Sequence, residues 1–178
     1  MSRNVKLLTR TAVLLALCIA SQFMKNASTY VTGSIVNAIL VVATLSCGFA
    51  GGAAISIIAP VTSWLITGSP IITAMPLVMV CIMGGNLLLV AAVALVQNKK
   101  SKWMLPVSLA IGSCVKAAFM WGTIVQAVLP LLGPGSGLPE KALLVAQTTF
   151  SVTQLVCALI GSAVAYTVWV FIGKHLDK

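Results

Sequence analysis

Residues 73–96 read TAMPLVMVCIMGGNLLLVAAVALV, a stretch that contains no charged side chain. A helix needs about 20 consecutive apolar residues to cross the hydrocarbon core of a bilayer. The length and the composition of this stretch therefore predict a membrane-spanning helix.

The rest of the chain has the same character. Of its 178 residues, 60% are hydrophobic and only 7% are charged, whereas about 25% of the residues of a soluble domain are charged. The expected fold class is an all-α integral membrane protein with six transmembrane helices in a single domain. The predicted helices cover residues 7–23, 33–47, 50–67, 73–96, 103–132 and 143–172.

The basic residues predict the orientation, because Lys and Arg collect at the cytoplasmic ends of membrane helices. With the N-terminus inside, only Lys25 and Lys141 face outward, and Lys116 lies within the membrane. Both termini are then cytoplasmic. Nucleic acid is not an expected partner despite the net charge of +9, since the basic residues lie in short clusters between apolar runs. The residues placed in the cytoplasm are Arg3, Lys6, Arg10, Lys99, Lys100, Lys102, Lys174 and Lys178.

The scarcity of acidic residues narrows the function. Glu140 and Asp177 are the only ones, and both lie outside the predicted spans, as does the single histidine, His175. No pair of carboxylates, Ser-His-Asp set or phosphate-binding loop is available for catalysis or nucleotide hydrolysis. We therefore expect no enzyme, no metal site and no cofactor. Proton coupling is disfavoured for the same reason, so uphill transport would need a partner that supplies the energy.

Lys116 is the exceptional residue of the spans. It lies near the middle of residues 103–132, in the run GSCVKAAFM at 112–120. A lysine at the centre of a membrane helix costs about 2.5–3.5 kcal/mol on insertion scales and is by default a functional hypothesis. No acidic side chain exists at that depth to neutralise it. The lysine can bind an anionic ligand, be held by amides and carbonyls, lose its proton or extend to the interface. The alternative to a ligand-binding role is that the lysine belongs to a polar cluster that binds no ligand.

Side-chain amides accompany Lys116 at membrane depth, and Gln22 ends the first predicted helix. Their depths predict a polar chamber that opens outward, covered by residues 25–32 and 67–74. The alternative role of each single amide is to form a hydrogen bond between two helices instead of lining a chamber. The candidate substrate-binding residues are Lys116, Asn86, Gln154, Asn37, Gln126 and Gln147, with Tyr30 as a candidate lid residue.

Ala12, Ala16 and Ala20 recur every four residues along the first predicted helix. Such a stripe of small residues lets helices approach closely. It serves either packing within the bundle or docking of another membrane subunit.

A short chain of six predicted helices, with a basic N-terminus inside and the Ala12-x-x-x-Ala16 motif extended by Ala20, resembles the substrate-binding S components of energy-coupling factor (ECF) transporters. The runs GSIVNA at 33–38, MPLVM at 75–79 and QLVCALIG at 154–161 are similar to segments of small bacterial S components. The resemblance covers the whole chain.

The resemblance implies a binding subunit in a bacterial plasma membrane. Such proteins bind a vitamin or related micronutrient in an outward-facing pocket covered by the loop after the first helix. The alanine face of that helix contacts a transmembrane coupling subunit, which works with two cytoplasmic ATPases. Lys116 without a counter-ion favours a carboxylate, as in pantothenate, nicotinate, lipoate or biotin, over riboflavin, thiamine or pyridoxine. A stand-alone facilitator and a non-transporting subunit of a membrane complex remain as alternatives.

Overall fold

The structure is a computed structural model that describes residues 2–24, 28–97 and 103–176, all of it helices and their connections. Five helical segments are long and apolar enough to cross a membrane, which makes the chain a multi-pass helical membrane protein. The elements are α1 (Arg3–Gln22), α2 (Thr29–Thr67), α3 (Pro70–Ala74), α4 (Leu77–Ala94), α5 (Met104–Met120), η1 (Trp121–Val128), α6 (Leu129–Leu132), α7 (Glu140–Thr149) and α8 (Val152–Leu176).

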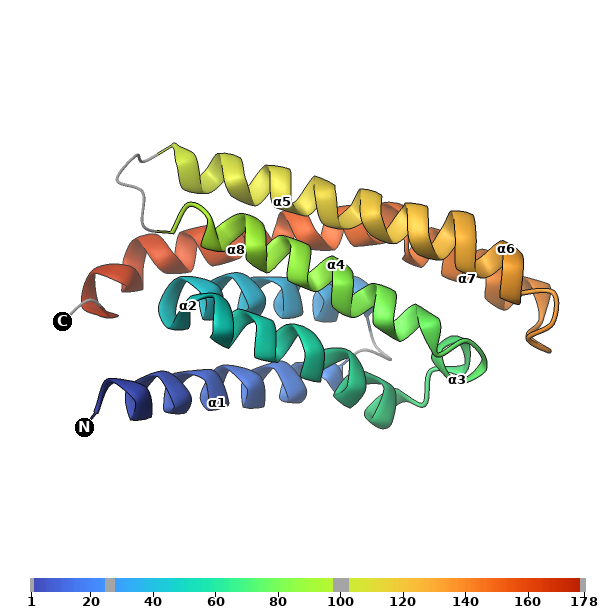
Figure 1. The fold of residues 1–178 in the computed structure, drawn as a ribbon, viewed down its shortest axis with the longest axis horizontal. Coiled ribbons are helices and arrows are strands. Elements are labelled where there is room, and N and C mark those ends of the chain that lie inside the picture. Colours follow the sequence, from blue (N-terminus) through green and yellow to red (C-terminus); the bar gives the residue numbers. More distant parts are fainter. Residues whose placement is uncertain (1, 25–27, 98–102, 177–178) are drawn as a thin grey trace.

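The segments predicted at 33–47 and 50–67 are the two arms of α2, which turns back at Gly48 (Figure 1). Gly48 has φ 77° and ψ −176°, a conformation that is essentially restricted to glycine. A straight helix of 39 residues would be about 58 Å long. Leu40 and Ala59 nevertheless belong to one buried cluster, so the two arms pack against each other as a hairpin.

The helix predicted over residues 73–96 is divided in two. Met75, at φ −134° and ψ 80°, separates α3 from α4. The residue before a proline is disfavoured in the helical region, because the proline ring clashes with its backbone, and Pro76 follows Met75. The membrane helix α4 therefore begins at Leu77, a short turn of helix later than expected.

The helix predicted over residues 103–132 runs without a break, but it changes from an α-helix to a π-helix along its length. Its middle segment, η1, is a π-helix, which has a wider turn than an α-helix. Pro130 follows in α6 and cannot donate a backbone hydrogen bond to the carbonyl four residues earlier. The wide turn accommodates this missing bond.

The helix predicted over residues 143–172 is interrupted between α7 and α8. Thr149 Oγ1 donates to the carbonyl of Val145 at 2.7 Å, and Ser151 Oγ donates to that of Gln147 at 2.6 Å. Hydroxyls that bond back to the preceding turn bend helices. Phe150, at φ −92° and ψ 6°, leaves the helical conformation there.

The hairpin of α2 lies at the centre of the bundle and contacts α1, α4 and α8, while α5 packs on α4 and α8. The helix α1 packs mainly on α2 and stands at one edge (Figure 1). The start of α1 and the end of α8 lie at the same end of the bundle. Several basic residues used to predict the orientation lie outside the described residues: Lys25, Lys99, Lys100, Lys102 and Lys178.

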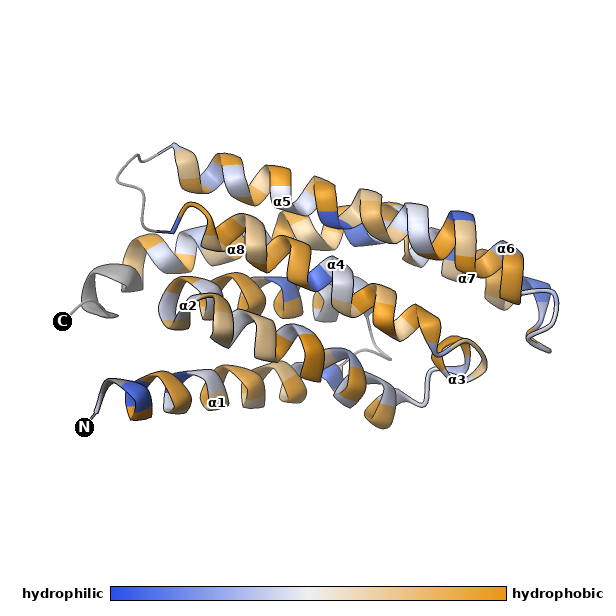
Figure 2. Ribbon diagram, in the orientation of Figure 1, coloured by the Kyte–Doolittle hydropathy of each residue, from blue (hydrophilic) through white to orange (hydrophobic). Residues whose placement is uncertain are grey.

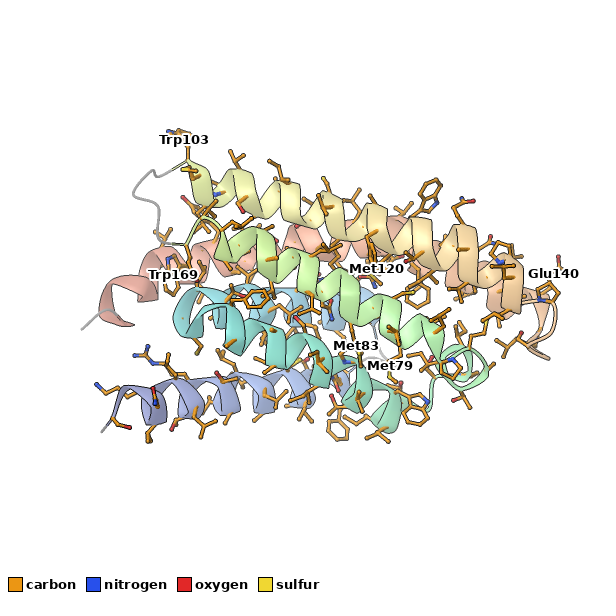
Figure 3. The ribbon with its side chains drawn as sticks, viewed as in Figure 1. Met79, Met83, Trp103, Met120, Glu140 and Trp169 are labelled. Carbon is orange, nitrogen blue, oxygen red and sulfur yellow. The ribbon has the colours of Figure 1, made fainter. Side chains whose placement is uncertain are left out.

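Hydrophobic residues predominate along the helices (Figure 2), and many large apolar side chains are exposed. Leu8, Phe23 and Phe171 each expose 70% or more of their surface. Trp103 and Trp169 lie toward the end at which α1 begins, and Glu140 lies at the opposite end (Figure 3). Apolar sides with tryptophans and charges toward the ends are typical of a protein that lies in a bilayer.

Candidate functional site

A cavity of about 200 Å³, mostly apolar but with several polar side chains in its wall, lies inside the bundle, bounded by both arms of α2 and by α1, α3, α4, α5 and the α7–α8 junction. Its walls extend to Thr29 at the start of α2 and to Ser69 beside α3, in the half of the bundle away from the N-terminus. One water takes about 30 Å³ in the liquid, so the cavity has room for several waters or one small organic molecule.

Lys116 of α5 forms part of the wall of this cavity and is only 2% exposed. Its Nζ donates to Oδ1 of Asn37 at 2.5 Å and to Oδ1 of Asn86 at 2.7 Å. No other acceptor reaches the ammonium among the described residues, and none of them forms an ion pair with it. The two amides supply partial negative charge, but no carboxylate of the described residues pairs with the lysine.

The two asparagines are themselves oriented. Asn37 Nδ2 donates to the carbonyl of Gly33 one turn earlier in α2, at 2.9 Å. Asn86 presents its Oδ1 to Lys116, which directs its Nδ2 elsewhere, and no acceptor for that Nδ2 lies within the described part of the chain. Both asparagines line the cavity, so Nδ2 of Asn86 is a second hydrogen-bond donor on the same wall as Lys116.

Close packing of α5 and α2 against α8 holds this cluster in place. Ser113 Oγ and Ser162 Oγ lie 3.0 Å apart across the α5–α8 contact, one turn from Lys116. A Cβ at Gly161 of α8 would lie 2.5 Å from the carbonyl oxygen of Ser34 and 2.6 Å from Cβ of Asn37. Only a glycine lets α8 lie this close to the arm of α2 that carries Asn37.

Gln22, at the end of α1, lines the same cavity and is 2% exposed. Its Nε2 donates to the carbonyl of Ala59 at 3.0 Å, which fixes the orientation of the amide. Its Oε1 is buried and has no hydrogen-bond donor in the described structure. The sequence predicted that Gln22 lies at membrane depth. Its position at the end of a predicted helix did not predict that its side chain packs against α2 and lines the cavity.

The predicted site residues fall into two groups. Lys116, Asn37, Asn86 and Gln154 all line the cavity, and the amide of Gln154 has no hydrogen-bond partner among the described residues. Gln126 on η1 and Gln147 on α7 are exposed and do not line it. Tyr30 is 53% exposed and also lies outside the lining, where its hydroxyl accepts from Thr153 Oγ1 at 3.5 Å.

Ala12, Ala16 and Ala20 of α1 are exposed. Because α1 packs mainly on α2, the stripe is not used for packing within this chain. Large apolar side chains flank it, including Leu8 at 72% and Leu17 at 55% exposure.

The cavity has the size and the lining to hold a small molecule. No group of three metal-ligating side chains occurs in the part of the chain that the structure describes. The cavity offers a lysine amine and several amides inside an otherwise apolar wall, as ligand-binding pockets with a few placed polar groups do. No protein-family model, curated protein or solved structure matches this chain.

Proposed function

We propose that this protein is the substrate-binding membrane subunit of an ECF-type importer, and that it captures a small anionic micronutrient from outside the cell. It delivers the substrate through a transmembrane coupling subunit that is driven by two cytoplasmic ATPases. The bacterial plasma membrane is its proposed location.

The observation that carries the proposal is Lys116 in the wall of a cavity, without a carboxylate partner among the described residues. Removing an ammonium from water costs several kcal/mol unless other groups replace the lost hydration. Two amide oxygens do so in part. A carboxylate in the cavity would complete the pairing, and the free energy of that interaction would appear as affinity.

The topology proposed is six membrane crossings with both ends in the cytoplasm. The hairpin at Gly48 supports it, because each arm of α2 has enough residues for a crossing or nearly so. The start of α1 and the end of α8 lie at one end of the bundle, which also supports an even number of crossings. The cavity then lies in the outer half, where a binding subunit must receive its substrate.

Docking of the coupling subunit is proposed on the face of α1 that carries Ala12, Ala16 and Ala20. The stripe is exposed, and its small side chains allow a partner helix to approach closely. A stand-alone facilitator would have no need for such a surface.

The test is ligand binding by the purified protein in mild detergent. Isothermal titration with pantothenate, biotin, nicotinate and lipoate should identify at least one carboxylate that binds. Replacing Lys116→Met should weaken that binding by about thirtyfold or more, since it removes the charged partner of a buried pair. Lys141→Met is the matched control, because Lys141 is exposed on α7 and lies outside the cavity.

Native mass spectrometry of the untreated protein adds a measurement that needs no chosen ligand. A co-purified acid of vitamin size supports the proposal. A protein that binds none of the four acids, or one whose affinity is the same in Lys116→Met, would count against it and favour a scaffolding role for the polar cluster.

A further inference from the structure

An apolar groove runs along the arm of α2 that precedes Gly48, between α1 and α8. It consists of two hollows of about 270 Å³ and 260 Å³, which are continuous because Leu14 and Val42 line both. Val164 of α8 lines it and is 49% exposed, so the groove opens on the outer surface of the bundle. It is separate from the cavity around Lys116, since no described residue lines both.

The groove has about the length of one leaflet of a bilayer. Among its α2 residues, Ser34 and Ser46 are the furthest apart, separated by about 18 Å along the helix axis. Half of the hydrocarbon core of a bilayer is about 15 Å thick. Because α2 crosses the membrane and the groove opens sideways, an acyl chain of a neighbouring phospholipid can lie in it without leaving its own leaflet.

Basic residues stand at one end of this groove. Arg10 of α1 lines it at the end that Ser46 also lines, whereas the part around Ser34 is lined by no charged residue. Lys6 is exposed one turn earlier on the same side of α1. A guanidinium pairs with a phosphate through two parallel hydrogen bonds, and a long basic side chain extends from an apolar surface toward the headgroups.

We infer that this groove binds one anionic phospholipid, with an acyl chain along α2 and the phosphate against Arg10. Basic pockets between membrane helices bind anionic headgroups in this way. A headgroup with a net negative charge suits Arg10 and Lys6 better than phosphatidylethanolamine, whose ammonium would lie near Lys6. Glu140 is the only acidic residue in the described part of the chain, and it lies at the opposite end of the bundle (Figure 3). It therefore offers no partner to that ammonium.

The groove and the alanine stripe lie on different sides of α1. Residues two apart on a helix point about 200° apart, so Arg10 and Ala12 face in nearly opposite directions. A lipid in the groove would leave the stripe open to a partner subunit. The inference goes beyond the proposed function and uses only its orientation, which would place the lipid in the cytoplasmic leaflet.

Native mass spectrometry of the delipidated protein in mild detergent tests the headgroup. The probes are phosphatidylglycerol and phosphatidylethanolamine with identical acyl chains. We expect one phosphatidylglycerol per chain, bound at least about fivefold more tightly than phosphatidylethanolamine, and Arg10→Gln should bring the two affinities within about twofold. Lys141→Gln is the matched control, because Lys141 is exposed on α7 and lies outside the groove.

A second pair of variants tests where the acyl chain lies. Val164→Trp should weaken the binding of phosphatidylglycerol by about tenfold or more, because the indole would fill the groove and exclude several methylene groups. Val170→Trp is the control. Both valines are on α8, with 49% and 48% exposure, and of the two only Val164 lines the groove.

Several results would overturn the inference. They are equal affinities for the two lipids, no binding of either, a preference that survives Arg10→Gln, or binding that Val164→Trp leaves unchanged. Protein dimers that Val164→Trp dissociates would assign the groove to a second copy of this chain instead. The comparison of the two lipids on the unmodified protein does not depend on the folding of any variant. No micronutrient is present, so failure here leaves the proposed function standing.

Discussion

Nζ of Lys116 lies 2.7 Å from Oδ1 of Asn86, a hydrogen bond that joins α5 to α4 inside the bundle. The same ammonium donates to Asn37 of α2, so one side chain connects three helices. Both bonds lie at the cavity, so the cluster serves the packing of the helices and, under the proposed function, the recognition of a ligand as well. Mutations can separate these two roles.

The replacement Asn86→Leu should lower the free energy of unfolding by about 2 kcal/mol, because Lys116 loses an acceptor while it remains buried. The double variant Asn86→Leu, Lys116→Met should recover part of this loss, since no unpaired charge is left. Thermal unfolding in detergent measures both. Asn4→Leu, an exposed asparagine on α1, should change stability by less than about 0.5 kcal/mol.

Equal melting temperatures for Asn86→Leu and the unmodified protein would mean that Lys116 finds another acceptor without cost. In that case, the hydrogen bond to Asn86 contributes nothing to stability.

Ala12→Trp and Ala16→Trp should abolish uptake in cells that contain the coupling subunit and the ATPases, and should leave ligand affinity within about twofold. The indole would prevent close approach of a partner helix to α1 but would not reach the cavity. Ala163→Trp is the control, because Ala163 is an exposed alanine on α8. Parallel loss of uptake and of binding would argue that the stripe stabilises the fold instead.

Gly161→Ala should lower the melting temperature by several degrees and should weaken ligand binding. The added methyl group would lie 2.5 Å from a backbone oxygen of α2 and 2.6 Å from Cβ of Asn37, so α8 and α2 would have to separate. Gly122→Ala, on η1, is the control, because no atom lies within 4 Å of its Cβ position. A Gly161→Ala protein that melts and binds like Gly122→Ala would show that α8 can shift without disturbing Asn37.

Gly48→Ala should destabilise the protein by about 1–3 kcal/mol, because the positive φ at this turn is strained for any residue with a Cβ. No atom lies near the Cβ position of Gly48, so the cost comes from the backbone alone. Gly135→Ala, in the loop before α7, has open space and no positive φ and should be neutral. Thermal unfolding compares the two, and equal stability would mean that the hairpin of α2 does not depend on this conformation.

Part of the candidate site could be predicted from the sequence. Lys116 was identified because a lysine in an apolar run is costly wherever the helix packs, and Asn37, Asn86 and Gln154 were named with it. Gln126 and Gln147 were named on the same grounds of depth, yet they are exposed on η1 and α7. Depth along a helix follows from the sequence, but the direction of a side chain around the helix depends on how that helix is rotated against its neighbours.

The sequence indicates only some of the positions at which the helices break or change type. Pro76 and Pro130 mark the start of α4 and the wide turn of η1, respectively. The break at Phe150 depends on hydroxyls that bond back to the preceding turn, but Thr44, Ser56 and Ser113 make the same kind of bond where the helix continues. The local sequence alone therefore does not distinguish a bend from a straight helix.

The sequence by itself determined that this is a helical membrane protein with one lysine in its spans, because hydropathy and charge are properties of each segment taken alone. Only the tertiary structure decided which groups meet. It placed Asn37 next to a lysine 79 residues away in the chain, and it placed the amide of Gln22 against the carbonyl of Ala59, 37 residues away. Such contacts depend on the turn at Gly48 and on the mutual rotation of packed helices, which no single segment specifies.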